Sequence, residues 1–391
     1  MVPEGWSEKR LEDVFKLGSG DGRPSDVVPE RSEEMPVPVY GGNGILGFTA
    51  SYNVDRPTIV IGRVGEYCGV TRFFSGKCWI TDNALYAKAV VPDVDIEFLA
   101  YRLQEFNLAR LRSKGGQPLV SQKPIYAQKL SFPPKSEQVK IVELLRLWDC
   151  AIDVVEKLIE SSRVKSRAVT RALLPPDKVL GNSNDDQWRF VRLGAIGATY
   201  GGLTGKSKAD FGSGKPYIPY KNVFENSVID LSNLDYVRVA ADESQSLVAS
   251  GDIVFTTSSE TPEEVGMSSV VLSEPEQLYL NSFCFGFRVF EKGVMAPEFA
   301  RFFFRSAPVR RRIVSLAQGS TRYNLSTRRF LELSFALPPF DEQMRIAQIL
   351  SDARQIEEAS CEYAAALRKE RDALMHQLLT GKRRIKVEAV Q

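Results

Sequence analysis

The chain has 391 residues, of which 43% are hydrophobic and 26% are charged, as in a soluble globular protein with room for two or three domains. A net charge of +2 excludes a uniformly basic protein that coats nucleic acid, so any such contact must come from local patches. Five cysteines without CxxC spacing exclude a disulfide framework, and neither a signal-peptide pattern nor an apolar run near the roughly 18 residues of a membrane span is present. We therefore expect a cytoplasmic protein.

The first part of the chain predicts short strands followed by one helix. Residues 58–61, 70–74 and 84–91 are apolar runs rich in β-branched and aromatic residues, separated by turns such as the glycine-rich 41–44. Residues 96–111 have the spacing of an amphipathic helix. These elements predict a first α/β domain over residues 1–131.

A short sequence motif then occurs in two copies. Phe-Pro-Pro-Lys-Ser-Glu-Gln at residues 132–138 returns as Leu-Pro-Pro-Phe-Asp-Glu-Gln at residues 337–343, and each copy leads into a long helical pattern. A double proline forces extended backbone before it, and Ser136 and Asp341 are good N-cap residues at the same place in the two copies. We expect two long helices, over residues 132–174 and 337–391, the second ending in a basic tail.

Each long helix carries apolar residues at alternating steps of four and three, as in a coiled coil. We predict that the packing residues are Ile141, Leu145, Trp148, Ile152, Val155 and Ile159 in the first helix and Ile349, Ala353, Ile356, Tyr363, Leu367 and Leu374 in the second. Helices of about 40 residues are roughly 60 Å long. An intermolecular coiled coil or a bundle is the alternative, but two such helices in one chain favour packing against each other.

The second half repeats this plan after a linker. The Pro175-Pro176 pair and the polar residues up to 187 predict a linker over 175–187. Residues 252–255, 269–272 and 285–290 predict strands, and residues 298–316 predict a helix interrupted at Pro308. A second α/β domain is therefore expected over residues 188–336.

Catalysis is poorly supported by the residues. The one histidine, His376, lies in the second long helix, which disfavours a histidine-based triad or a histidine-rich metal site. In the Gly-Gly-Leu-Thr-Gly-Lys-Ser segment at 201–207, only three residues lie between Gly201 and the Gly-Lys pair, whereas a P-loop needs four between its first glycine and that pair. The Pro338-Pro339-Phe340 run is similar to the Asn/Asp-Pro-Pro-aromatic loop of amino-methyltransferases. Leu337, however, stands where that loop has the polar residue that holds the target amine. We expect no catalytic residue and no metal site. The alternative is an enzyme that binds a nucleotide through the 201–207 loop, and measurable ATP binding by the chain would support it.

Binding to nucleic acid is better supported, because basic, aromatic and amide residues recur in the predicted turns of both domains. Lysine and arginine neutralise phosphates, and arginine, asparagine and glutamine pair with base edges. The candidates are Arg63, Tyr67, Arg72, Lys77, Lys114, Gln117 and Lys123 in the first domain and Lys206, Lys208, Lys215, Tyr220, Lys221, Asn222, Arg322, Tyr323, Asn324 and Arg328 in the second.

The layout resembles the DNA-specificity subunit of Type I restriction–modification enzymes over nearly the whole chain. The resemblance rests on Gly115-Gly116-Gln117-Pro118-Leu119 and on residues 318–325, each followed by a Pro-Pro and Glu-Gln cassette. It also rests on the runs 214–220 and 251–254 in the second half, and on Trp79-Ile80-Thr81-Asp82-Asn83-Ala84 in the first. The two recognition domains are otherwise poorly alike in sequence.

The resemblance implies an α+β protein with two α/β target-recognition domains, separated by two long antiparallel coiled-coil helices in a pseudo-twofold internal repeat. It implies a non-catalytic chain that binds double-stranded DNA and assembles with two modification (methyltransferase) subunits and with restriction (endonuclease/translocase) subunits. S-adenosylmethionine, ATP and Mg would be bound by those partners and no cofactor by this chain.

Each domain would then read one half of a bipartite, asymmetric DNA site, with the helices setting the unread spacer. A non-catalytic coiled-coil adaptor, and the specificity subunit of a related methylation-only or Type IIB system, are the alternatives.

Overall fold

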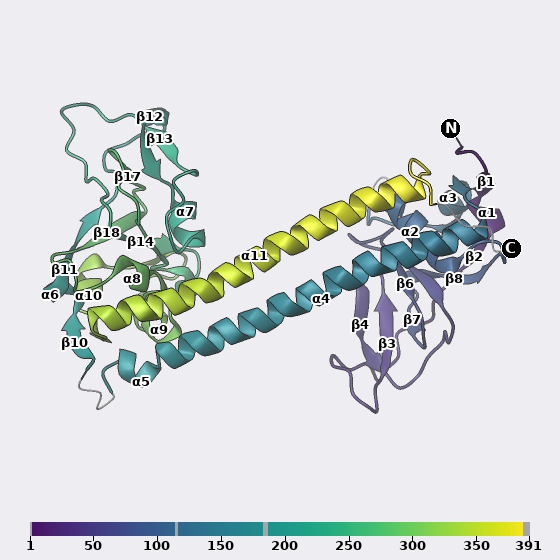
Figure 1. Ribbon diagram of the computed structural model, residues 1–391, viewed down its shortest axis with the longest axis horizontal. Helices are drawn as coiled ribbons and strands as arrows, with labels where there is room; N and C mark the ends of the chain where they lie inside the picture. Colours follow the sequence, from purple (N-terminus) through teal and green to yellow (C-terminus); the bar gives the residue numbers. More distant parts are fainter. Residues whose placement is uncertain (1, 114–115, 183–186, 386–391) are drawn as a thin grey trace. The chain divides into compact units, whose positions relative to one another are not determined.

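A computed structural model describes residues 2–113, 116–182 and 187–385. The chain divides into two compact units, the first made of Met1–Lys157 with Glu362–Gln391 and the second of Leu158–Cys361. Each unit therefore contains one β-rich part together with one half of each long helix (Figure 1).

The first unit contains three sheets. A four-stranded antiparallel sheet has the order β2 (Phe15–Ser19), β8 (Ala84–Val90), β5 (Thr58–Gly62), β6 (Thr71–Phe74). A three-stranded sheet has the order β4 (Gly44–Thr49), β3 (Val37–Gly41), β7 (Trp79–Ile80), and β3 and β7 are parallel. Strands β1 (Ser7–Arg10) and β9 (Lys129–Phe132) pair separately. The short helices are α1 (Leu11–Val14), α2 (Ile96–Phe106), the 3-10 helix η1 (Leu108–Leu111) and α3 (Gln122–Tyr126).

The second unit has the same three sheets in the same strand order. Its four-stranded sheet is β11 (Gly197–Gly201), β18 (Cys284–Val289), β14 (Ile253–Thr256), β16 (Ser268–Val270). Its three-stranded sheet is β13 (Asp235–Val237), β12 (Phe211–Ile218), β17 (Tyr279–Leu280), again with the last pair parallel. Strand β10 (Arg189–Arg192) pairs with β20 (Ser334–Leu337). One further pair, β15 (Ser258–Ser259) with β19 (Tyr323–Asn324), is added.

The described part of the second unit has counterparts of the four short helices of the first unit and four further short helices. Together they are α5 (Pro176–Val179), α6 (Leu193–Ile196), η2 (Lys208–Asp210), α7 (Tyr220–Glu225), η3 (Pro262–Glu264), α8 (Pro297–Phe303), α9 (Ala307–Val314) and α10 (Thr327–Leu331). The two β-rich parts are thus far more alike in topology than their sequences indicated. The predicted linker becomes helix α5 at its start, and its residues 183–186 lie outside the described residues.

Both predicted amphipathic helices are broken near their middle. In the first unit α2 ends at Phe106. The next residue, Asn107, has a φ of +58° in the left-handed region that asparagine tolerates, and η1 follows it. In the second unit the break precedes α9, where Pro308 lies in the first turn and its missing N–H costs nothing.

The long helices are α4 (Lys135–Leu173) and α11 (Phe340–Leu379). Pro134 and Pro339 carry the carbonyls that accept the first bonds of these helices, from the N–H of Glu137 at 3.0 Å and of Gln343 at 2.9 Å. Ser136 and Asp341 therefore lie inside the first turn, which corrects their prediction as N-caps. Of the described helices, none is long and apolar enough to cross a membrane.

The ends of both long helices belong to the cores of the units. In the first unit Ile141 and Leu145 of α4 join Leu378 and Leu379 of α11 around the buried ring of Phe132. In the second unit Ile346 and Leu350 of α11 reach a phenylalanine-rich core that contains Phe255, Phe285, Phe304 and Phe330. Burial of these side chains fixes each helix to its own β-rich part.

In each unit α4 and α11 pack side by side (Figure 1). In the first unit Arg371 contacts Asp149 at 2.9 Å and Arg368 contacts Glu156, so the helices run antiparallel because one number falls as the other rises. In the second unit Arg163 pairs with Glu357 at 3.0 Å. The expected α+β class, with two β-rich domains and two long helices packed together, is confirmed.

The packing face of α11 differs from the predicted one. Ala353, Leu367 and Leu374 are partly buried, but Ile349, Ile356 and Tyr363 are 40%, 60% and 58% exposed, so those three predictions are corrected. The positions one residue further along, Leu350, Glu357 and Ala364, are buried or half-buried instead, and Arg371 is also half-buried. Alanine 364 is small enough for close helix approach, and the two charged residues are held by ion pairs. On α4 the predicted residues are buried (Ile141, Leu145, Ile159) or half-buried (Trp148, Ile152, Val155).

Candidate nucleic-acid interface

In the first unit three loops are joined by backbone hydrogen bonds beyond the end of β5. The Arg63 N–H donates to the Asn83 carbonyl at 3.0 Å, and the Arg63 carbonyl accepts from the Val120 N–H at 2.9 Å. The Gly65 N–H donates to the Pro118 carbonyl at 2.9 Å. We call this meeting of residues 63–69, 82–83 and 116–120 the first loop junction.

The second unit repeats the junction with different side chains. The Thr257 N–H donates to the Phe283 carbonyl at 2.8 Å, and the Thr257 carbonyl accepts from the Leu325 N–H at 2.8 Å. Thr257 thus takes the place of Arg63, and Phe283 takes the place of Asn83. Residues 257–266, 282–283 and 318–325 form the second loop junction, so one backbone frame presents two unlike sets of side chains.

An arginine clamps the first loop of each junction. In the first unit Arg112 donates to the carbonyls of Glu66 at 2.7 Å and Cys68 at 3.1 Å. In the second unit Arg310 donates to the carbonyls of Glu263, Val265 and Gly266. Burial lowers the pKa of Arg310 to about 10, which leaves it charged at neutral pH. Sequence reasoning did not assign either arginine this role, because nothing in the local sequence marks a side chain that binds distant carbonyls.

A close approach of backbone explains the second glycine of the segment that resembles a phosphate loop. A Cβ on Gly202 would lie 2.0 Å from the carbonyl oxygen of Asn281, and a Cβ on Gly20 would lie 2.2 Å from that of Ile80. Both glycines follow the first strand of the four-stranded sheet where it passes the three-stranded sheet. Gly202 is therefore required where these two backbone segments cross.

The first junction brings together some of the predicted residues. Arg63, Tyr67 and Gln117 lie in its loops, and Tyr67 and Gln117 are exposed. Arg72 lies on β6 and donates to the Asn43 carbonyl at 3.4 Å, in the glycine-rich turn. That turn is adjacent, because a Cβ on Gly42 would lie 2.8 Å from the Val64 carbonyl oxygen.

The other predicted residues of the first unit lie elsewhere. Lys77 is placed over the ring of Tyr52, 4.4 Å from its centroid, and Lys123 is exposed on α3. Lys114 lies outside the described residues.

The second junction contains Arg322, Tyr323 and Asn324, with Tyr323 and Asn324 forming β19. Tyr220 reaches the same place from α7, since its hydroxyl donates to the Ser258 carbonyl at 2.8 Å. Lys208, Lys215, Lys221 and Arg328 are exposed on η2, β12, α7 and α10.

Two predicted contacts of the second domain are corrected. The Lys206 ammonium pairs with Glu243 and donates to the Arg238 carbonyl, and its side chain is only 5% exposed. Asn222 is buried, and its amide binds the backbone of Asp230 and Asn233. Both side chains are occupied in holding loops together, so neither is free to contact a ligand.

Phe283 is a residue that the sequence reasoning missed. Its ring is 49% exposed, and the Arg322 guanidinium lies over it at 4.9 Å from the centroid. An exposed aromatic ring stacked with arginine suits contact with a base or sugar. The signal was available: Tyr279-Leu280-Asn281-Ser282-Phe283-Cys284 has the pattern of Trp79-Ile80-Thr81-Asp82-Asn83-Ala84.

Within residues 2–113, 116–182 and 187–385, no group of three or more His, Cys, Asp or Glu side chains could hold a metal ion. His376 instead contacts Glu105 at 2.8 Å on the surface of the first unit. The two units thus share one backbone frame and present unlike side chains at their loop junctions.

The comparisons with known proteins identify the class further. A family profile described as "Type I restriction modification DNA specificity domain" matches residues 3–161 and 185–360, and the chain therefore belongs to that family of DNA specificity subunits. The family supplies the specificity part of the Type I system and not its catalytic part.

Several relatives are similar over different lengths. The Type I restriction enzyme EcoprrI specificity subunit of Escherichia coli is 30% identical over 40% of this chain and 39% of its own. The MjaVIII specificity subunit of Methanocaldococcus jannaschii is 24% identical over 98% of this chain and 94% of its own. The S subunit of a Type I system from M. genitalium has the same fold, with a TM-score of 0.62 at 17% identity over 97% of this chain and 96% of that one.

Proposed function

We propose that the chain reads a bipartite, asymmetric DNA sequence, one half through each loop junction. The observation that carries this proposal is the shared backbone frame with different side chains: Arg63 and Asn83 in the first unit correspond to Thr257 and Phe283 in the second. Identical frames present their side chains in equivalent poses, and unlike side chains select unlike bases. The proposed recognition domains are residues 1–131 and 188–336.

Within each junction the exposed polar residues are suited to direct readout. Gln117 and Asn324 offer amide groups that pair with adenine, and Arg322 offers a fork that pairs with guanine. The exposed cations Lys208, Lys215, Lys221 and Arg328 are suited to phosphates, which fix position without reading sequence.

We further propose that α4 and α11 set the length of the unread spacer. The ion pairs of the first unit and the Arg163–Glu357 pair of the second support pairing of the two helices within each unit. Two half-sites on the same face of a duplex recur about every 34–36 Å, and helices of this length can bridge such a distance.

Two modification subunits are the proposed partners of the helix pair, with restriction subunits added for cleavage. Leu147 and Val154 of α4 and Ile356 and Tyr363 of α11 remain exposed apolar side chains on the long helices. Exposed apolar surface of this kind typically marks a protein interface. S-adenosylmethionine, ATP and Mg would be bound by those partners.

Methylation mapping tests the proposal. With modification subunits present, we expect methylated adenines to lie in one two-part motif with a fixed gap. Replacing residues 11–111 by those of a relative should change one half of that motif only. Methylation without a two-part motif, or a swap that changes both halves, would overturn the proposal.

The alternative of a coiled-coil adaptor predicts no change in DNA binding when the chain is added to its partners. A methylation-only or Type IIB system predicts the same two-part motif with a different cleavage outcome. Assays of DNA binding and cleavage on the same duplex distinguish these alternatives.

A further inference from the structure

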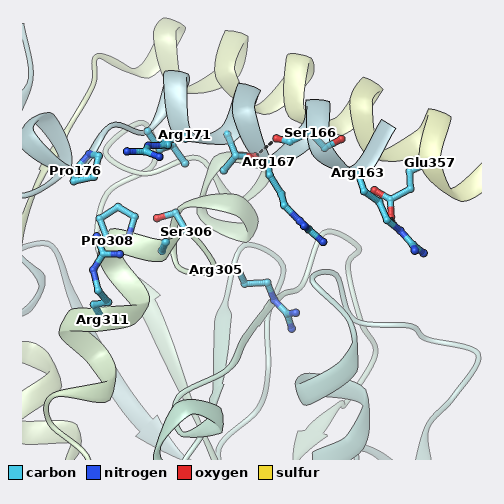
Figure 2. Close-up of a pocket in the computed structure, with 13 residues that line it drawn as sticks. Arg163, Ser166, Arg167, Arg171, Pro176, Arg305, Ser306, Pro308, Arg311 and Glu357 are labelled. Carbon is cyan, nitrogen blue, oxygen red and sulfur yellow. Dashed lines mark hydrogen bonds and ion pairs between the residues drawn. The ribbon is translucent and has the colours of Figure 1, made fainter. Parts of the chain in front are cut away.

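The second unit contains a pocket of about 710 Å³ whose lining is dominated by arginine (Figure 2). Arg163, Arg167 and Arg171 border it from α4, and Arg305 and Arg311 border it from the opposite side. Glu357 is the one carboxylate among the lining residues. The pocket lies away from the loop junction, on elements to which the proposed function assigns no DNA contact.

Two of these arginines are already committed to the fold. Arg163 pairs with Glu357 at 3.0 Å. Arg305 donates to the carbonyls of Val223, Phe224, Asn226 and Ser268. Arg167, Arg171 and Arg311 have no hydrogen-bond or ion-pair partner within the part of the chain that the structure describes. Three guanidinium groups without a partner therefore line the pocket, and its one carboxylate, Glu357, is already paired with Arg163.

The spacing of the arginines on α4 is unfavourable without a counter-ion. Residues 163, 167 and 171 follow each other at i, i+4, so they lie on one face of the helix. Like charges at this spacing destabilise a helix by about 0.2–0.5 kcal/mol per pair. Burial, together with the charges of Arg354, Arg310 and Arg301, also lowers the pKa of Arg305 to about 10, which indicates a positive potential around the pocket.

The start of α9 adds one backbone donor, the N–H of Ala307, to the same pocket. Ser306 precedes the helix, but its hydroxyl donates to the Phe303 carbonyl at 2.6 Å and does not cap the helix. Ala307 and Pro308, which open the helix, both line the pocket. An uncapped N–H group at a helix start attracts anions, and that of Ala307 lies beside three arginine side chains.

We infer that this pocket binds phosphate groups, held by Arg167, Arg171 and Arg311 at the start of α9. Guanidinium forks and helix N-termini both match the tetrahedral oxygens of phosphate. A volume in the range of about 300–1,000 Å³ suits a small phosphorylated ligand such as a polyphosphate or nucleotide, or one stretch of nucleic-acid backbone.

The test uses the full-length chain with two probes, inorganic tripolyphosphate and a short random-sequence DNA duplex. The pocket variant carries Arg167→Gln, Arg171→Gln and Arg311→Gln, which are exposed positions without partners, so the fold is retained. A control variant with the same loss of charge carries Arg189→Gln, Lys292→Gln and Arg345→Gln, exposed positions of the same unit. Calorimetric titration measures each affinity, and thermal unfolding verifies that both variants are folded.

We expect the wild type and the control variant to bind tripolyphosphate at one site, and the pocket variant to bind about tenfold or more weakly, because charge-assisted hydrogen bonds are lost. If only the duplex is weakened by the pocket variant, the phosphates come from DNA. Equal binding by both variants, or no binding of either probe, would overturn the inference. Binding of polyglutamate in the pocket without binding of either phosphate probe would also overturn it. These outcomes do not depend on sequence-specific recognition, which methylation mapping tests separately.

Discussion

Gln138 and Gln343 make the same hydrogen bonds at the start of α4 and of α11. The Gln138 side-chain oxygen accepts from the Asp95 N–H at 2.7 Å, and its amide donates to the carbonyls of Asp93 at 3.1 Å and Pro133 at 2.9 Å. Gln343 repeats these bonds, each at 2.9 Å, with Ala296, Val294 and Pro338. Both side chains are 1% exposed. The repeated Glu-Gln cassette is therefore a buried joint that ties each long helix to the loop before α2 or α8.

Removal of this joint should destabilise one unit. We expect Gln343→Met to lower the free energy of unfolding by about 3 kcal/mol, since it leaves buried backbone groups unpaired. Gln348→Met, an exposed position of the same helix, should change it by less than about 0.5 kcal/mol. Denaturant unfolding measures both, and equal values would show that the joint does not support the fold.

The displaced packing face of α11 gives a second prediction. Ala364→Leu places a large side chain at a position that is 1% exposed and should cost about 1–3 kcal/mol by overpacking. Ile356→Ala removes an exposed side chain and should cost less than about 0.5 kcal/mol in the chain without partners. Thermal unfolding compares the two, and the reverse order would favour the face predicted from sequence.

The strands and the two long helices could be predicted from the sequence, because β-branched runs and heptad spacing are local signals. Part of the packing face of α11 was predicted wrongly, because an apolar pattern does not count charged residues that lie on the inner face. Glu357 and Arg371 lie on the inner face because Arg163 and Asp149 neutralise them, and that pairing joins residues about 200 positions apart.

The candidate site was predictable only in part for a similar reason. Arg322 and Asn324 lie in loops that the resemblance marked, and the structure brings them to one junction. Lys206 and Asn222 have the right chemistry, but long-range contacts with Glu243 and with the backbone of Asp230 use their polar atoms. Residue type reports what a side chain can bind, and the fold decides whether it is free.

The clamping arginines should act on one half-site each. Arg310→Lys keeps the charge but loses the fork that holds three carbonyls, so the 257–266 loop loosens. We expect about tenfold weaker recognition of the half read by the second domain, with the other half unaffected. Arg112→Lys should show the opposite pattern.

Arg312→Lys is the matched control on α9, because Arg312 is exposed. Methylation rates on duplexes altered in either half measure these effects. Equal losses at both halves for either variant would contradict a positioning role.

Arg322 and Arg328 separate base contact from phosphate contact. Arg322 stacks on Phe283 in the second junction, and its replacement by glutamine should cost about 1–3 kcal/mol and relax selectivity at one base pair. The side chain of Arg328 is 92% exposed. Its replacement by glutamine should weaken binding to all DNA sequences and reduce the slope of log K against log salt concentration by about one. Binding across a salt series and a panel of base changes tests both, and the same profile for the two variants would contradict the assignment.

The helix pair should act as a ruler for the DNA spacer. Seven residues inserted between Val155 and Glu156, and seven between Arg368 and Lys369, preserve the packing face because seven residues complete nearly two turns. Each insertion adds roughly 10 Å, or about three base pairs of duplex. Because each ion pair lies wholly on one side of the two insertions, Glu156 stays opposite Arg368 and Asp149 stays opposite Arg371.

We expect the methylated motif to keep both halves and to gain about three unread base pairs, or binding to be lost if the second domain no longer faces its groove. A single insertion in α4 should disturb the helix pairing and lower thermal stability, which makes it the control for a structural effect. Methylation mapping on a duplex library with varied spacers measures the result, and retention of the original spacing by the stable double variant would rule out the ruler.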